Sequence, residues 1–478
     1  MSRRPAFVVV ALAFLAACTD VDHTPTALTS VPDPALAQQD VDRLNEAQLN
    51  SLLSRVLARH GFTGQKNWQV MPQLGRAVNP TLADIGRLLF FDPVIALKGD
   101  NSCAGCHAPQ HGFGDSQSIA IGIDNNGIVG PARQGPRNQR RSPQLLNAAF
   151  FPRLMWNSRF SAGSGNPFDN SGGFSFPAPE GRSLSYLPHL LTAQAFIPTV
   201  ERVEMTGFDF VGDNDAIRAE VVRRVNLVDG YRSRFGAVFP EVRGGGPLTY
   251  DHLASAIAEF TFTLRFANAP IDEFARGNWS AMTLSEKRGA LLFFGKARCV
   301  ECHAVSGESN EMFSDFKEHV IALPQVAPFN TNVSFDGPGA NEDFGLEQVT
   351  GDPVDRYAFR TSPIRNVALQ PTFGHNGAYT RLPDMIRHHL NAYTALANYT
   401  PQKAGVAPDL WAPMAPTGPL LSRLDPRLQT PITLEPNEFG YLVDFVATGL
   451  LDRSARPDRL RRLIPSALPS GAPVHNFQ

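Results

Sequence analysis

"NSCAGCHAPQHGF" (residues 101–113) contains the pattern Cys-x-x-Cys-His, and "KARCVECHAVSG" (residues 296–307) contains it again. The residues of the two copies are Cys103, Cys106 and His107, and Cys299, Cys302 and His303. Such a pattern can hold a covalent haem, a zinc ion or a redox-active disulfide. Two copies need one common explanation, and the rest of the chain distinguishes among the three.

Covalent haem accounts for every position of the pattern. Two thiols add to the porphyrin vinyl groups, and the adjoining histidine becomes an iron ligand. A zinc site built from both pairs needs them to converge, although Cys103 and Cys299 are much farther apart than the roughly 15–20 residues of common four-cysteine modules. A thioredoxin-like site has one pair and no need of the histidine. The sequence therefore predicts two covalently bound haem c groups, with His107 and His303 as proximal ligands.

The N-terminus, "MSRRPAFVVVALAFLAACTD", has the layout of a bacterial export signal, with two arginines, an apolar run and small residues before Cys18. The apolar run is too short to span a bilayer permanently. Because "LAAC" resembles a lipoprotein box, we expect residues 1–17 to be a signal peptide, Cys18 to carry a lipid anchor to the outer membrane, and residues 18–45 to tether the protein on the periplasmic side. The alternative is an ordinary cleaved signal. Either agrees with c-type haem, which is attached outside the bacterial cytoplasm.

Composition narrows the class of protein further. The chain has 478 residues, of which 43% are hydrophobic and 18% charged, as expected for a globular protein of two domains. Its net charge of −2 gives no general attraction to nucleic acid or to anionic lipid. With Cys18 assigned to the anchor, every other cysteine belongs to one of the two motifs, so no conventional structural disulfide is expected.

The segments before the two motifs resemble each other, which indicates an internal duplication. "NPTLADIGRLLFFDP" (residues 79–93) and "SAMTLSEKRGALLFFGK" (residues 280–296) share a Thr-Leu start and a run of Gly-x-Leu-Leu-Phe-Phe. Each run suits an amphipathic helix that covers a haem face. The capping arrangements predicted to start these helices are Thr81 with Asp84 and Thr283 with Glu286.

The predicted fold is mainly α: two cytochrome c-like domains, each with one covalent c-type haem, packed around an inter-haem interface. We place the N-terminal domain at residues 46–267 and the C-terminal domain at residues 268–465. Gly and Pro are frequent in residues 161–181, which are predicted to form a long loop, either a lid or a disordered insertion.

These motifs together resemble the bacterial di-haem cytochrome c peroxidases and their relative MauG, over nearly all of the chain after the tether. The likeness rests on six segments in the family order, which are "IGRLLFFDP…SCAGCH", "RRSPQLLNAAFFPRLMW", "FIPTVERVEM", "GALLFFGKARCVECH", "FRTSPIRNVALQPTFGHNGAY" and "LPSGAPV". The resemblance implies that the N-terminal haem reacts with hydrogen peroxide and that the C-terminal haem relays electrons to it.

The resemblance also implies site residues. A tryptophan between the haems matches Trp156, and a distal glutamine and glutamate match Gln194 and Glu204. Splitting an O–O bond requires a proton to be moved between the two oxygens, which suits a positioned carboxylate. Glu204 is the candidate and Glu201 its competitor. Without the resemblance, Glu204 would be read as an exposed carboxylate and Trp156 as a core aromatic.

The peroxidatic iron must keep one position open. Many relatives block that position with a movable histidine after the first motif. Here His111 is too close to His107 along the chain to reach the opposite face easily, so a constitutively open site is expected. His189 is the possible exception.

On the C-terminal haem, the family has a methionine or a tyrosine as second ligand, fourteen positions after the histidine of the "HNG" motif. Counting from His375 gives His389. Met385 is one turn earlier on the predicted helix face and competes with it, whereas His388 points elsewhere. The alternative is that His388 and His389 belong to an ordinary helix surface.

Calcium is the remaining cofactor that the resemblance implies, held between the haems by an asparagine side chain and backbone carbonyls. Arg141 stands at the asparagine position. Because a cation opposes a second cation, calcium is in doubt, and the arginine charge is the expected substitute.

Three functions follow. The first is reduction of hydrogen peroxide with electrons from a small redox protein, either a cytochrome c or a cupredoxin. The second is peroxide-driven oxidation of a protein partner in the manner of MauG, and the third is electron transport without catalysis. Gln194 and Glu204 beside an open iron favour the enzymes, while the donor or protein substrate is not named by the sequence.

Overall fold

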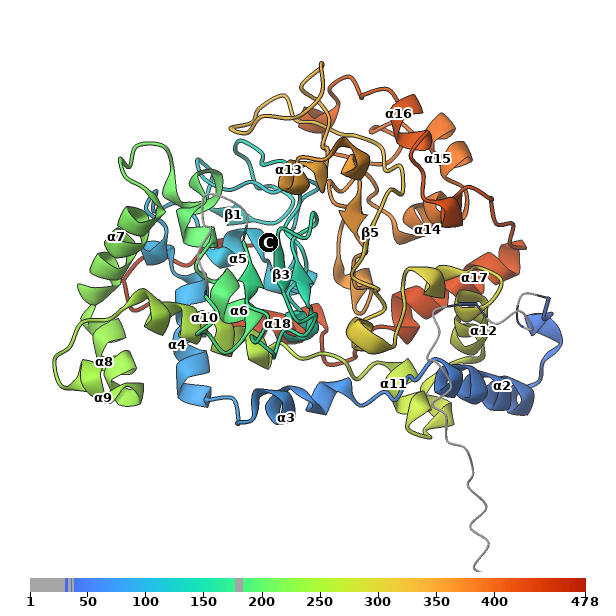
Figure 1. The fold of residues 1–478 in the computed structure, drawn as a ribbon, viewed down its shortest axis with the longest axis horizontal. Helices are drawn as coiled ribbons and strands as arrows, with labels where there is room; N and C mark the ends of the chain where they lie inside the picture. The colour runs from blue at the N-terminus through green and yellow to red at the C-terminus, as the bar shows by residue number, and fades with distance from the viewer. Residues whose placement is uncertain (1–30, 33–35, 37, 177–183) are drawn as a thin grey trace, which may run out of the picture.

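The computed structural model describes residues 31–32, 36, 38–176 and 184–478, and it is mainly helical as predicted (Figure 1). The signal peptide at residues 1–17, Cys18, part of the tether and residues 177–181 of the predicted loop lie outside the described residues. No helix of the described part is long and apolar enough to cross a membrane.

The helices form two groups that lie side by side in Figure 1. The group around the first motif contains α3 (Val70–Leu74), α4 (Pro80–Phe91), α5 (Cys103–Cys106), α6 (Leu190–Gln194), α7 (Asn214–Asn226), α8 (Asp229–Val238), α9 (Pro240–Arg243), α10 (Tyr250–Thr263) and α18 (Pro457–Leu460). The group around the second contains α2 (Glu46–Arg59), α11 (Pro270–Ala275), α12 (Leu284–Phe294), α13 (Glu347–Thr350), α14 (Leu382–Leu390), α15 (Ala392–Asn398), α16 (Gly418–Leu421) and α17 (Pro436–Asp444).

The strands are short, as the scarcity of alternating sequence predicts. They form three small sheets: β1 (Ile128–Val129) with β7 (Asn476–Phe477) in parallel; β2 (Arg153–Leu154), β3 (Phe160–Ala162) and β4 (Phe174–Ser175) antiparallel; and β5 (Glu318–His319) with β6 (Phe359–Arg360) antiparallel. The described part of the predicted 161–181 loop thus contributes most of β3 and all of β4 to a three-stranded sheet.

The two helices before the motifs start differently. At α12 the predicted capping box of Thr283 and Glu286 is confirmed. At α4 the predicted pair of Thr81 and Asp84 is wrong, because the Asn79 side chain accepts from the first backbone N–H groups. Pro80 then occupies the first helical position, where its fixed φ suits the helix and its missing N–H costs nothing.

The glycines of the repeated run allow two close helix crossings. A Cβ atom on Gly86 of α4 would lie 1.8 Å from the Ala256 carbonyl oxygen of α10. A Cβ on Gly289 of α12 would lie 1.9 Å from the Tyr441 carbonyl oxygen of α17. Only glycine permits backbones to approach so closely, so both halves pack the helix before the motif against a later helix in the same way.

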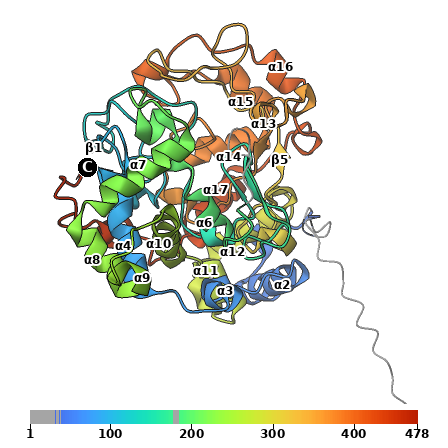
Figure 2. The same cartoon turned by 60° about the vertical axis from the view of Figure 1, so that its left-hand side comes forward.

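The first long helix and the C-terminal residues of the described chain each pack on the half that is more distant in sequence. Helix α2, assigned from the sequence to the N-terminal domain, instead packs Leu49, Leu53 and Val56 into the core around α12 (Figures 1 and 2). The C-terminal residues pack in the opposite direction, with Leu468 against the core around Phe90. The predicted range 46–267 therefore does not describe one packed unit. The apolar face of α2 is buried wherever a complementary apolar surface is available, and that surface belongs to α12 rather than to a helix nearer in sequence.

Replacing Gly289 with alanine tests the crossing of α12 and α17. The added methyl group meets backbone atoms that cannot rotate away, so we expect unfolding in denaturant to show a loss of about 1–3 kcal/mol or more. The matched control is Gly440→Ala on α17, where a Cβ has no neighbour within 4 Å. Better helix propensity should make this variant neutral or more stable by up to about 1 kcal/mol. Equal stabilities for the two variants would contradict the crossing.

Candidate functional site

The two Cys-x-x-Cys-His motifs line two separate cavities. Cys103, Cys106 and His107 line the N-terminal cavity, and Cys299, Cys302 and His303 line the C-terminal cavity. The two pairs do not converge, and among the described residues no group of three or more His, Cys, Asp or Glu side chains is placed to hold a metal ion. The alternative of one zinc site built from both pairs therefore has no geometric support.

The four thiols are unpaired and partly exposed at the two cavities. Burial raises the pKa of Cys106 to about 11 and that of Cys299 to about 12. A redox-active dithiol needs the opposite shift, because the thiolate is the reactive form. The thiols thus do not resemble those of a thioredoxin-like site.

Each motif histidine is fixed by one backbone carbonyl. Nδ1 of His107 lies 3.0 Å from the Phe113 carbonyl oxygen, and Nδ1 of His303 lies 2.9 Å from that of Phe313. Both phenylalanines have left-handed backbones, with φ of 55° and 57°, an uncommon conformation for this residue type. With Nδ1 engaged, Nε2 is the nitrogen left to coordinate iron.

Burial keeps these imidazoles neutral. It lowers the pKa of His107 to about 4 and that of His303 to about 4. A metal-binding histidine must be deprotonated, so both side chains are in the ligand form at neutral pH.

The aromatic surroundings of the two histidines repeat closely. The Phe90 ring centre lies 6.3 Å from that of His107 and 5.4 Å from that of Phe260. In the second half, the Phe293 ring centre lies 6.4 Å from that of His303 and 5.4 Å from that of Phe445. This repeated geometry agrees with the duplication expected from the sequence.

In the C-terminal cavity, a second imidazole faces the motif histidine. The ring centres of His303 and His389 are 6.2 Å apart. Two imidazoles that coordinate one metal from opposite sides, with bonds of about 2 Å, have ring centres about 6 Å apart. The Met385 carbonyl holds Nδ1 of His389 at 2.9 Å, which leaves Nε2 for a metal. These residues therefore fit a haem bound from both faces.

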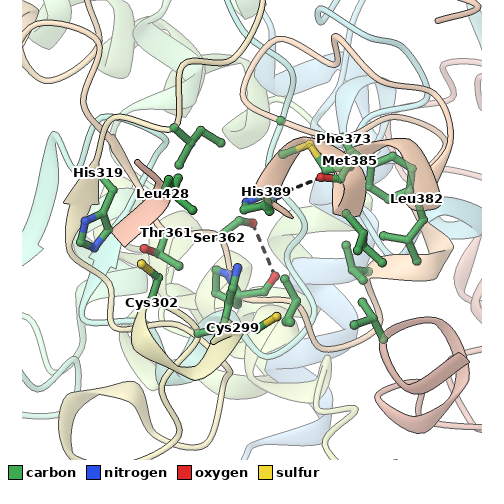
Figure 3. Close-up of a pocket in the computed structure, with 18 of the residues that line it drawn as sticks. Cys299, Cys302, His319, Thr361, Ser362, Phe373, Leu382, Met385, His389 and Leu428 are labelled. Atoms are coloured by element: carbon green, nitrogen blue, oxygen red, sulfur yellow. Dashed lines mark hydrogen bonds between the residues drawn. The ribbon is translucent and has the colours of Figure 1, made fainter. Parts of the chain in front are cut away.

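The other side chains of helix α14 take different places. Met385 lines the same cavity as His389, as Figure 3 shows, so it stays a competitor on geometry alone. His388 is buried outside the cavity, where its two nitrogens lie 3.0 Å from the Tyr379 hydroxyl and 2.8 Å from the Ile321 carbonyl oxygen. His388 is thus a satisfied core residue.

The N-terminal cavity has no second histidine: among the described residues that line it, His107 is the only one. His111 ends a short turn and does not line the cavity. His189 is wholly buried and caps helix α6, with Nδ1 accepting from the Leu191 N–H at 3.0 Å and Nε2 3.0 Å from the Ala149 carbonyl oxygen. Neither residue can block the face opposite His107 in this arrangement.

Two glutamates line the N-terminal cavity, and their partners differ. Glu201 forms an ion pair with Arg159 at 2.7 Å. Glu204 makes no hydrogen bond or ion pair through its carboxylate with any described residue. Burial, and next the charge of Glu201, raise the pKa of Glu204 to about 7, although Arg159 opposes the shift.

The backbone around Glu204 is held rigidly beside the motif. The Asn101 side chain donates to the Glu204 carbonyl at 2.9 Å, and the Ile123 N–H donates to the Val203 carbonyl at 3.2 Å. Gln194, the last residue of α6, lines the same cavity. The structure thus brings both distal residues predicted from the sequence beside His107.

Trp156 lines both cavities, which places it between them. Its indole Nε1 donates to the Arg141 carbonyl at 2.8 Å. Arg141 also lines both cavities, and its guanidinium is buried. Because a buried guanidinium opposes a second cation, the side chains present do not fit a calcium ion at this place.

Sequence reasoning missed three groups at these cavities. Arg159 neutralises Glu201, and Arg360 lines both cavities beside Arg141. His319 lies at the C-terminal cavity between Asp315 at 2.9 Å and Asp425 at 2.7 Å, and these two carboxylates outweigh burial to raise its pKa to about 9. Arg360 stands in the segment "FRTSPIRNVALQPTFGHNGAY" without being singled out there, whereas Arg159 and His319 pair with carboxylates to which no motif connects them.

The fold and the two sites define a class, a mainly helical protein with a Cys-x-x-Cys-His motif at a cavity in each half and a pair of glutamates at one of the two cavities. The family model described as "Di-haem cytochrome c peroxidase" matches residues 80–280. The methylamine utilization protein MauG of Methylorubrum extorquens is 28% identical over 66% of this chain and 69% of its own. The cytochrome c551 peroxidase of Nitrosomonas europaea is 27% identical over 64% of this chain and 72% of its own.

Solved structures agree on the fold. A MauG-like protein associated with microbial copper homeostasis has a TM-score of 0.55 at 23% identity, covering 79% of this chain and 91% of its own. The diheme peroxidase BthA of Burkholderia thailandensis has a TM-score of 0.54 at 21% identity, covering 84% and 92%. Over residues 80–280 the chain thus matches the di-haem cytochrome c peroxidases, and the curated proteins that it resembles include both MauG and cytochrome c peroxidases.

Proposed function

We propose that the chain is an oxidoreductase that reduces hydrogen peroxide at its N-terminal site, with electrons supplied through its C-terminal site. The observation that carries this proposal is Glu204, an unpaired, partly buried carboxylate in a cavity whose only described histidine is the motif histidine. A covalent haem c held by Cys103, Cys106 and His107 would supply the redox chemistry there. A second would be held by Cys299, Cys302 and His303.

The role of Glu204 is to move a proton between the two peroxide oxygens. A pKa near 7 suits this task, because a general acid–base group works best when its pKa is close to the working pH. Glu201 is less suited, since Arg159 holds its charge in an ion pair. Gln194 can orient peroxide, because its amide offers both a donor and an acceptor to the same cavity.

In the C-terminal site we assign His303 and His389 as the two axial ligands. Methionine ligation raises the potential of a haem relative to histidine, so this assignment predicts a lower potential than that of a His/Met site. Trp156, which lines both cavities, is the residue we assign to the electron path between the sites.

Peroxide-driven oxidation of a protein partner, as in MauG, uses the same two sites and fits equally well. The two functions differ in what docks on the surface: a small cytochrome c or cupredoxin as donor, or a protein substrate. Peroxide consumption with such donors, compared with mass analysis of cell-envelope proteins after peroxide treatment, separates them. A carrier without catalysis has no need of Glu204 and Gln194 beside a site with no second histidine.

The site of action that we propose is the periplasmic side of the cell envelope, with Cys18 as the lipid-bearing residue. The N-terminal sequence supports this placement. Cys18→Ala should release the protein from the membrane fraction, and membrane retention of that variant would argue against the anchor.

Two haems per chain are the first expected outcome. Replacing both Cys103 and Cys106 with alanine should remove one covalent haem and leave the other, because each cysteine pair serves one porphyrin. Haem staining of the denatured chain and an iron determination measure this. One iron per unaltered chain would refute the two-haem assignment.

Changing Glu204 to Gln keeps the side-chain shape and removes the titrating group. We expect the peroxide reaction to slow by about 10²–10⁴-fold, while both haem spectra stay nearly unchanged. In the unaltered protein the deprotonated form is the base, so the rate should rise with pH through about 7, and the variant should lack that rise. Glu201→Gln is the matched control and should retain the pH profile. A normal rate in Glu204→Gln would make Glu204 a bystander.

Replacing His389 with alanine should abolish the low-spin signal of the C-terminal haem in electron paramagnetic resonance, because one axial ligand is lost. Met385→Leu is the control and should leave that signal intact. A methionine–iron charge-transfer band in the unaltered protein, or a low-spin signal that survives in His389→Ala, would assign the position to another residue.

A further inference from the structure

Two buried arginines lie between the cavities without a carboxylate partner. Arg141 is 5% exposed and Arg360 is 4% exposed, and both line both cavities. Neither forms an ion pair with any described residue. Asp115 acts on Arg141 and Glu318 on Arg360, but only from beyond ion-pair distance. A buried charge is costly unless it is paired, so each guanidinium can accept a closer anion.

The other buried arginines show how the chain normally satisfies such a group. Arg365 pairs with Asp272 at 2.7 Å, Arg218 pairs with Asp215 at 3.0 Å, and Arg137 pairs with Asp409. Arg133 has no carboxylate partner, but its donors reach three backbone carbonyls and the Asn101 side chain. Arg141 and Arg360 are therefore exceptions within the described fold.

Most donors of these two guanidiniums are unused. A guanidinium has five N–H donors. Arg141 donates only to the Gln370 side chain, and its Nε is buried with no partner. Arg360 donates to the carbonyls of Met155 at 2.9 Å and Thr361 at 3.1 Å. Burial lowers the pKa of each arginine to about 10, although Asp115 opposes the shift at Arg141 and Glu318 opposes it at Arg360.

A third donor at the same place points to the same kind of ligand. Gln144 lines both cavities, and its Nε2 is buried without a partner. Two cations and an orphaned amide N–H form a site for an anionic acceptor that reaches both cavities. The groups expected to fill the cavities carry such acceptors, because haem bears propionate carboxylates.

We propose that Arg141 and Arg360 bind the propionates of both haems and form a fixed cationic bridge around Trp156. This proposal rests on the two haems of the proposed function. Two hydrogen bonds to the backbone of the arginines hold Trp156 beside them: its indole donates to the Arg141 backbone carbonyl at 2.8 Å, and its own carbonyl accepts from the Arg360 backbone N–H at 2.7 Å. The bridge takes the place of a metal ion between the haems.

The bridge predicts the direction in which the haem potentials move. A nearby positive charge favours the reduced haem, because reduction adds an electron. Arg141→Gln and Arg360→Gln should each lower the midpoint potentials of both haems, by at least about tenfold in the reduction equilibrium, or about 59 mV for one electron. Spectroelectrochemical titration of the holoprotein measures both potentials.

Two further variants separate charge from structure. Arg141→Lys keeps the charge and should remain closer to the unaltered potentials than Arg141→Gln. Arg137→Gln removes an equally buried arginine that lines neither cavity, so it should leave both potentials in place. If Arg141→Gln does not retain both haems, the midpoint potentials of Arg360→Gln test the bridge, because this variant leaves the side chain of Arg141 unchanged.

The pH dependence gives an independent readout. A guanidinium lowers the pKa of a neighbouring carboxyl group, so the propionates should stay ionised well below neutral pH in the unaltered protein. In the glutamine variants the propionates should titrate closer to neutrality, and the haem potentials should then depend more steeply on pH between about 5 and 8. An unchanged profile would contradict a contact between the arginines and the propionates.

The outcomes distinguish this proposal from the proposed function. If the unaltered chain carries fewer than two haems, the proposed function fails first. If all variants retain two haems and the potentials of Arg141→Gln and Arg360→Gln move no more than those of Arg137→Gln, only the bridge is overturned. A metal chelator should leave the unaltered potentials unchanged, and a shift after chelation would overturn the replacement of a metal by arginine.

Discussion

Both halves of this protein depend on a hydrogen bond between the motif histidine and a backbone carbonyl that follows it, six residues later in the first half and ten residues later in the second. Phe113 and Phe313 supply these carbonyls from left-handed conformations, at 3.0 Å and 2.9 Å from Nδ1. The bond selects the tautomer, orients the ring and leaves Nε2 to the cavity. The phenylalanine side chains pack on the same aromatic clusters that hold the helices before the motifs. The same two phenylalanines therefore contribute to the core with their side chains and orient the motif histidines with their carbonyls.

The two halves share this fixed motif histidine and differ in the other side chains that line the cavity. Helix α14 brings His389 across from His303, whereas the cavity at His107 is lined by Gln194 and Glu204 and by no second histidine among the described residues. One site thus fits a metal held from both faces, and the other has polar side chains in place of a second ligand. The pairing of Arg159 with Glu201 sharpens this difference, because it leaves the neighbouring Glu204 as the carboxylate without a partner.

Charge at the junction connects the two sites. Trp156, Arg141 and Arg360 each line both cavities, and hydrogen bonds tie the tryptophan to both arginines. In a low-dielectric interior such charges act strongly on any redox group nearby. A change at this junction therefore reaches both halves at once, unlike a change at either motif.

The sequence by itself determined the two Cys-x-x-Cys-His motifs, the mainly helical class and the repeated segments before the motifs, because each is carried by a local pattern. The family resemblance pointed to Gln194 and Glu204, and the structure places both at the N-terminal cavity. It also predicted the cap of α12, but not that of α4, where Pro80 makes Asn79 the first capping residue. Only the tertiary structure decided that α2 packs on the C-terminal half, that His189 is a helix cap and that Arg141 and Arg360 form no ion pair with any described residue. These features depend on contacts between residues that are distant in sequence. Such contacts produce no local or periodic pattern from which they could be predicted.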